Sequence, residues 1–185
     1  VQFLKSVDGE LAAFNRLQEF INKDRGNFEL RLMLAQLYQT SKELDKAKAE
    51  FQHIIEQGAE TKQGQKAMYH LALINISEGD FSAAKQQVEA MLKENATSAE
   101  AFMLKGQIAL HEQDIDGAIA DFKQVLRTEP ESAVVLGLLA RAQVRKGDRE
   151  AAKRNYQLSL TAPGAPKESY FELAQLMLDE KQYVA

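Results

Sequence analysis

The sequence has 185 residues, of which 45% are hydrophobic and 27% are charged, and its formal net charge is −4. This composition is typical of a folded protein and excludes extended disorder. The acidic balance leaves no basic face of the kind that a nucleic-acid backbone requires. Cysteine is absent, which excludes disulfides and thiolate metal sites. Since no apolar run reaches membrane-spanning length, we expect a soluble chain, with the cytoplasm and the periplasm both open as its compartment.

The first residues of the chain match only the second half of a helical hairpin. Val1 to Ser6 matches the last turn of a helix, and Asp8-Gly9 predicts a turn after it. Glu10 to Lys23 is then predicted as a second helix without a preceding partner. We therefore expect the first 27 residues to be the C-terminal half of a truncated repeat.

Four helical hairpins are predicted next, each made of two amphipathic segments joined by a short polar turn. They pair 28–41 with 44–57, 65–78 with 81–94, 99–112 with 115–128, and 133–146 with 149–161. Pro163 and Gly164 end the last of these, because neither continues a helix well. Residues 167–180 repeat the first-helix pattern alone. The predicted units, all in one continuous solenoid domain, are residues 1–27, 28–64, 65–98, 99–132, 133–166 and 167–185.

Small residues return at a fixed period along these hairpins. Ala118 follows Ala84 by 34 residues, and Ala152 follows Ala118 by 34. The second-helix row is Ala13, Ala47, Ala84, Ala118 and Ala152, and the first-helix row is Ala35, Ala72, Gly106, Ala140 and Ala174. Between Ala47 and Ala84 the step is 37, which predicts a longer inter-repeat turn near Thr61 to Gly64.

A period near 34 residues in helix-turn-helix units resembles the tetratricopeptide repeat. The resemblance implies an all-α, right-handed superhelical solenoid whose first helices line an inner groove. Two positions depart from the family pattern: Arg31 stands where a large apolar residue is usual, and Lys105 replaces a usual leucine. We expect Leu104 and Ile108 to supply the packing near Lys105. Pentatricopeptide repeats have nearly the same period and bind RNA, but the acidic charge disfavours them.

The groove implied by the resemblance is the candidate functional surface. Its rows mix apolar residues with glutamines, which suits an extended peptide or an amphipathic helix. The predicted partner-binding residues are Leu32, Gln36, Tyr69, Leu73, Ile76, Met103, Gln107, Leu110, Arg141, Val144, Arg145, Phe171 and Gln175. The alternative is that some of these side chains are buried between neighbouring first helices.

Arg141 and Arg145 are the one basic pair predicted to face this groove, where they could seat a partner carboxylate. The alternative is a solvated pair, or one neutralised by Glu168 or Asp179. The lysines and asparagines of the chaperone-type carboxylate clamp are missing from the matching positions, which hold residues such as Leu32 and Tyr69.

No pattern indicates catalysis, a metal or a cofactor. His53, His70 and His111 fall in different repeat positions, and none has a second ligand at metal-binding spacing. The sequence contains no phosphate-binding glycine motif and no nucleophile motif. We therefore expect a protein that is not an enzyme.

Two functions stay open. The first is a scaffold that binds a peptide or helix of a partner protein, with Tyr69, Met103, Leu110 and Phe171 as anchors. The alternative is a structural spacer in a large multi-repeat protein of a bacterial envelope or secretion assembly. In either case the half repeats at both ends predict a fragment of a longer solenoid, with self-association through the uncovered ends as a hypothesis.

Overall fold

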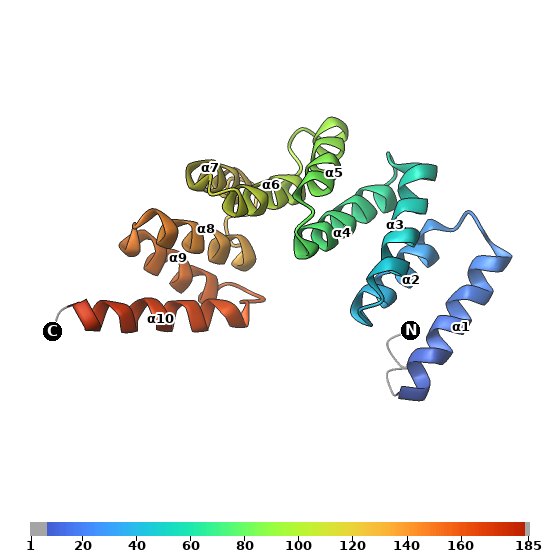
Figure 1. Cartoon of the computed structure of the whole chain (residues 1–185), viewed down its shortest axis with the longest axis horizontal. Helices are drawn as coiled ribbons and strands as arrows, with labels where there is room; N and C mark the ends of the chain where they lie inside the picture. The colour runs from blue at the N-terminus through green and yellow to red at the C-terminus, as the bar shows by residue number, and fades with distance from the viewer. Residues whose placement is uncertain (1–6, 184–185) are drawn as a thin grey trace. The chain divides into compact units, whose positions relative to one another are not determined.

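The protein is all-α, as the sequence predicts. The structure is a computed structural model that describes residues 7–183, and every regular element among them is an α-helix (Figure 1). Val1 to Ser6, predicted as a helical turn, lies outside the described residues. The helices are α1 Val7–Lys23, α2 Phe28–Thr40, α3 Leu44–Gly58, α4 Lys62–Glu78, α5 Phe81–Glu94, α6 Ala99–His111, α7 Ile115–Leu126, α8 Ala133–Lys146, α9 Arg149–Thr161 and α10 Lys167–Tyr183.

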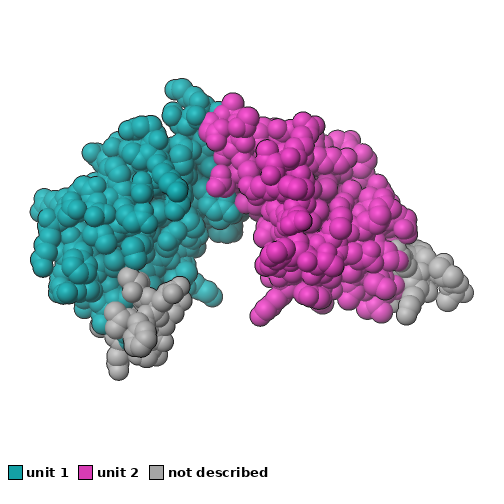
Figure 2. Space-filling view, turned by 180° about the vertical axis from the view of Figure 1, so that it is seen from behind, with its two compact units in different colours: residues 1–94 teal, residues 95–185 magenta. Residues whose placement is uncertain are grey.

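These helices form two compact units that meet in the sequence between Glu94 and Asn95 (Figure 2). In unit 1, α2 pairs with α3 and α4 pairs with α5, while α1 packs on α2 and α3 packs on α4. In unit 2, α6 pairs with α7 and α8 with α9, while α7 packs on α8 and α9 on α10. The second helices α3, α7 and α9 thus each contact both their own first helix and the next one within the unit.

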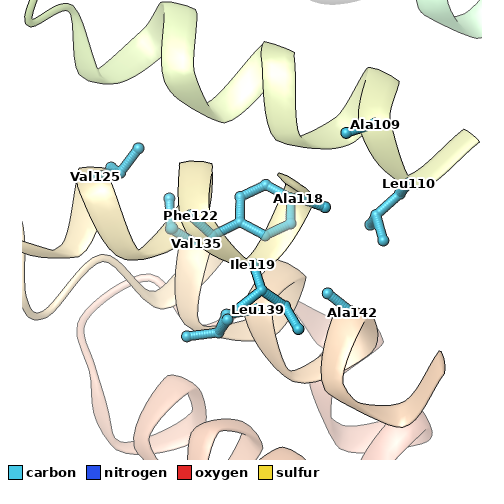
Figure 3. Packing of buried hydrophobic residues seen from close by; sticks show 9 residues of the cluster. All are labelled: Ala109, Leu110, Ala118, Ile119, Phe122, Val125, Val135, Leu139 and Ala142. Carbon is cyan, nitrogen blue, oxygen red and sulfur yellow. The ribbon is translucent and has the colours of Figure 1, made fainter. Parts of the chain in front are cut away.

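Small residues allow the helices to approach closely, as their period predicts. Ala84, Ala118 and Ala152 are fully buried. Gly106 of α6 lies against Phe122 of α7, and a Cβ atom on Gly106 would be 2.5 Å from the Cε1 atom of the ring. The Phe122 ring lies at the centre of an apolar cluster that α6, α7 and α8 share (Figure 3). Burial of these side chains, rather than turn chemistry, holds each unit together.

The turn inside each hairpin has one residue in the left-handed conformation. Gly79 and Gly147 adopt it with φ of 81° and 86°, and Lys42 and Gln113 adopt it with φ of 62° and 64°. In three turns the next residue is an aspartate whose carboxylate accepts a backbone N–H at 2.9 to 3.1 Å and so caps the second helix: Asp80, Asp114 and Asp148. Because only glycine adopts positive φ without strain, the Lys42 and Gln113 turns store energy that the glycine turns do not.

Two predicted turns are wrong, and both lie in unit 1. Asp8 and Gly9 are inside α1, because burial of the helix outweighs the roughly 1 kcal/mol helix penalty of a glycine. The residues between Thr61 and Gly64 do not lengthen a turn but extend α4, which Thr61 caps by accepting the Gly64 N–H at 3.0 Å. Glycine is required at 64, since a Cβ there would be 2.1 Å from the Gly58 carbonyl oxygen.

One polar row, missed in the sequence, joins the two helices of every hairpin. The row comes from the second helix and repeats with the same steps of 37, 34 and 34 as the alanines. Its members and their first-helix partners are Glu50 with Arg31 (2.8 Å), Gln87 with Asn75 (3.2 Å), Asp121 with Lys105 (2.9 Å) and Asn155 with Gln143 (2.7 Å). Each hairpin therefore has a polar contact in this row that links its two helices in addition to apolar packing.

Candidate functional site: the first-helix face

The candidate surfaces are the faces of α2 and α4 in unit 1 and of α6, α8 and α10 in unit 2 that carry the predicted groove residues, and we call each of them the first-helix face of its unit. The two are described separately. In unit 1, α2 lies beside α4, and the Gln36 side-chain nitrogen is 3.0 Å from Nε2 of His70. Tyr69, Leu73 and Ile76 are half-buried on α4. Leu32, by contrast, is buried in the core, so the alternative of burial between helices holds there.

His70 contributes more to unit 1 than the sequence indicated. Its ring stacks on Phe51 of α3 with centroids 5.3 Å apart, and Tyr69 meets it edge-on at 5.5 Å. Nδ1 of His70 is buried without a hydrogen-bond partner among the described residues. Burial lowers the pKa of His70 below its usual value, and the nearby positive charge of Lys66 lowers it further. His70 is therefore a neutral structural residue that joins α2, α3 and α4.

In unit 2 the predicted groove residues of α6 likewise include both half-buried and fully buried side chains. Met103 and Gln107 are half-buried, and Met103 packs on the apolar cluster of α6, α7 and α8. Leu110 is buried within that cluster, so its side chain is not available to a partner (Figure 3). Its backbone carbonyl accepts a hydrogen bond from Nη1 of Arg145 at 2.7 Å, which joins α6 to α8.

Both arginines of the predicted carboxylate-binding pair have partners within the protein. Arg141 makes an ion pair with Glu172 of α10, with Nη2 2.6 Å from Oε1. Glu172 also accepts the hydroxyl of buried Tyr156 at 2.8 Å. Burial, and then this carboxylate, raise the pKa of the tyrosine well above its usual value. Arg145 is exposed, and within residues 7–183 its one hydrogen-bond acceptor is the neutral carbonyl of Leu110.

Neither acidic residue considered from the sequence neutralises this pair. Asp179 instead accepts from Gln175 at 2.9 Å and lies 3.9 Å from Arg149. Glu172 was missed, although its position three residues after Ser169 and four before Leu176 places it on the face of α10 that packs on α9.

The last first helix, α10, has the most exposed apolar side chains. Phe171 is 73% exposed and Leu178 is 56% exposed, and Gln175 between them is also exposed. Ala174 is exposed as well, although the same row is buried in α2, α4, α6 and α8. On α8, Val144 is 37% exposed. Unit 2 therefore presents apolar side chains to solvent on the face where the sequence predicts a partner.

The described residues contain no group of three histidine, cysteine or acidic side chains that could hold a metal ion. His53, His70 and His111 lie on three different helices, α3, α4 and α6. Among the helices within residues 7–183, none combines the length and apolar character needed to span a membrane.

The geometry defines a helical-repeat protein whose first helices expose one face. Comparison with known protein families identifies the kind of repeat. The model of the tetratricopeptide repeat-like domain matches residues 6–137. The chain therefore belongs to the tetratricopeptide repeat-like family, whose members are generally protein-interaction scaffolds and typically not enzymes.

Solved structures agree with this fold. The crystal structure of MamA is similar with a TM-score of 0.66 and 18% identity, over 90% of this chain and 92% of that one. TTC0263, a tetratricopeptide repeat protein of Thermus thermophilus, has a TM-score of 0.73 and 16% identity, over 92% and 91%. A chain of the APC/C hetero-tetramer Cut9–Hcn1 has a TM-score of 0.79 and 14% identity, over 95% of this chain and 34% of that one. No curated protein sequence matches significantly. At these identities the similarity concerns the fold alone.

Proposed function

We propose that the chain is a non-catalytic scaffold whose first-helix face binds a peptide or helix of a partner protein. The observation that supports this most is the exposure of Val144, Phe171 and Leu178 on the first-helix face of unit 2. Apolar side chains clustered on one surface are more often a partner site than scattered ones. Half-buried Tyr69 and Met103 add amphipathic contact area on the corresponding faces of the two units.

Arg145 is the cationic group best placed to help such a partner. Its guanidinium is exposed and donates to the Leu110 carbonyl, which is a neutral acceptor. A carboxylate of the partner would be a stronger acceptor, because an ionised acceptor makes a charge-assisted hydrogen bond. Arg141 already has a carboxylate partner in Glu172, so it is expected to orient α10 rather than to bind the ligand.

The test compares exposed apolar residues on the first-helix face with one outside it. Leu178 on α10 and Leu158 on α9 are 56% and 54% exposed, but only Leu178 lies on the first-helix face. Partners captured by the wild-type chain should be lost with Leu178→Ser together with Phe171→Ser and retained with Leu158→Ser. If the Leu158 variant loses the same partners, or the Leu178/Phe171 variant retains them, the first-helix face is not the binding surface.

A second candidate is a structural role in a longer repeat array. Tyr170, Ala174 and Met177 of α10 are exposed, whereas their rows are buried or half-buried in α4, α6 and α8. A further helix packed on these residues would continue the array, whether it came from the same polypeptide or from another copy. Tyr170→Ser with Met177→Ser would then abolish assembly measured by light scattering while leaving capture of the Leu178-dependent partners intact.

A further inference from the structure

Unit 1 contains a cavity that none of the predicted groove residues lines. It has a volume of about 600 Å³ and lies between the C-terminal end of α1, the start of α2 and the C-terminal half of α3. Its polar lining residues are Gln18, Asn22, Arg25, Arg31, His53 and Gln57. Buried Ile21 and half-buried Phe28 supply its apolar surface. Its volume is within the range of ligand-binding pockets, about 300 to 1,000 Å³.

The cavity coincides with a departure from the repeat pattern. Arg31 occupies the row that holds Met68, Phe102 and Leu136 in the next three first helices, and Met68 and Leu136 are buried. A bulky apolar side chain packs into the hairpin at this row, whereas the Arg31 guanidinium turns to Glu50 at 2.8 Å. The substitution therefore exchanges an apolar packing residue for a cation at the wall of a cavity.

The charges around the cavity do not cancel. Arg25 is exposed, and among the described residues its guanidinium has no hydrogen-bond or ion-pair partner. Arg31 is matched by Glu50. The neighbouring Asp24 does not line the cavity, and its carboxylate accepts from Asn27 at 3.1 Å. One net positive charge, that of Arg25, thus faces the cavity together with the donors of His53 and three side-chain amides.

We propose that this cavity binds an acidic peptide segment of a partner protein, with an Asp or Glu carboxylate at Arg25 and an apolar neighbour against Phe28. A single uncompensated cation matches a carboxylate monoanion better than a phosphate dianion. Gln18, Asn22 and Gln57 offer both donors and acceptors, which a peptide backbone needs. The site is separate from the first-helix face, so it adds a second contact and does not depend on the proposed function.

The test titrates the full 185-residue chain, labelled with ¹⁵N, with two matched peptides. The probes are acetyl-Leu-Glu-Leu-amide and its neutral analogue acetyl-Leu-Gln-Leu-amide, followed by inorganic phosphate. The acidic peptide should shift the amide signals of Asn22, Gly26 and His53 and saturate. Arg25→Gln should weaken its binding about five- to tenfold, as loss of a charge-assisted contact requires. Arg16→Gln is the control, since Arg16 is on α1 outside the cavity and pairs with exposed Glu19.

Two further variants test the charge of Arg31. Glu50→Gln releases Arg31 from its carboxylate and should strengthen binding of the acidic peptide about two- to fivefold. Arg31→Met combined with Glu50→Gln restores the apolar residue of the row, removes the Arg31 cation and should cancel the gain from Glu50→Gln while the chain stays folded. The groove variant Leu178→Ser should bind the peptide like the wild type.

Four outcomes would overturn the proposal. They are an absence of saturable shifts at the cavity, equal binding of the neutral peptide, equal weakening by Arg16→Gln and Arg25→Gln, and phosphate binding as tight as that of the acidic peptide. The third would indicate diffuse surface charge, and the fourth would assign the cavity to phosphate groups.

Discussion

Gly106→Ala tests the close packing of helices on which the fold depends. Gly106 lies at the crossing of α6 and α7, where a Cβ would be 2.5 Å from Cε1 of Phe122 and 2.9 Å from Cδ1 and Cζ. All three atoms belong to one rigid ring, and Phe122 is fully buried, in an interior where close packing leaves a ring little room to shift. The added methyl group must therefore separate the two helices or distort the cluster of α6, α7 and α8.

The magnitude follows from two opposing effects. Alanine is favoured over glycine in a helix by about 1 kcal/mol. Overpacking of a well-filled core costs about 1 to 3 kcal/mol, and a contact with a buried ring is at the upper end of that range. We expect a net loss of about 1 to 2 kcal/mol in the free energy of unfolding, which corresponds to a fall in Tm of about 2 to 8 °C for a chain of this size.

The assay is urea and thermal unfolding of Gly106→Ala in two backgrounds, the wild type and Phe122→Leu. The smaller Leu side chain removes the ring atoms that the methyl group would contact, so the loss caused by Gly106→Ala should shrink by about 1 kcal/mol there. Stabilisation by Gly106→Ala in the wild type, or an identical effect in both backgrounds, would refute the packing argument.

Three more predictions concern stability. Ala118→Leu should lower the free energy of unfolding by about 1 to 3 kcal/mol in urea titrations, because Ala118 is fully buried at a helix crossing. Gln113→Gly should raise Tm, since φ of 64° at this residue imposes strain of about 1 kcal/mol that glycine avoids; an unchanged or lower Tm would contradict this. The folded-state pKa of His70 is lowered by burial and by Lys66, so the unfolded chain binds more protons there. Stability should therefore fall as the pH drops below about 6.5, and the stability of His70→Gln should fall less between about pH 7.5 and 5.5 in the same titration.

The repeat pattern predicted most of the fold because closely packed helices require small residues at the positions where they cross. A residue as small as Ala118 recurs only where two helices cross, and its burial confirms that reason. Leu104 and Ile108 are buried beside Lys105, as expected from their helical spacing. The helical conformation of Asp8-Gly9 and of Lys62 to Gly64 was not predicted, because weak local turn preferences yield to helix packing and to an N-cap.

The candidate site was less predictable than the fold. The position of a residue in the repeat indicates which face of its helix it occupies. It does not indicate how closely the neighbouring helix packs against that face. Leu32 and Leu110 share that face with Phe171, yet they are buried and Phe171 is exposed. Arg141 and Arg145 contact residues that are 31 and 35 positions away in the sequence, on other helices. The spacing of residues within the repeat does not determine such contacts. One feature of the sequence pointed to the cavity beside Arg31: an arginine stands where the repeat usually has a large apolar residue.

Site-directed cross-linking tests the proposed partner surface most directly, because the chain has no native cysteine. Val144 of α8 is 37% exposed and belongs to the first-helix face, whereas Leu158 of the second helix α9 is 54% exposed and does not. A photo-reactive maleimide attached to Val144→Cys should cross-link the captured partner, and the same probe on Leu158→Cys should not. Equal cross-linking from both positions, or from Leu158→Cys alone, would contradict the proposal that the first-helix face receives the partner.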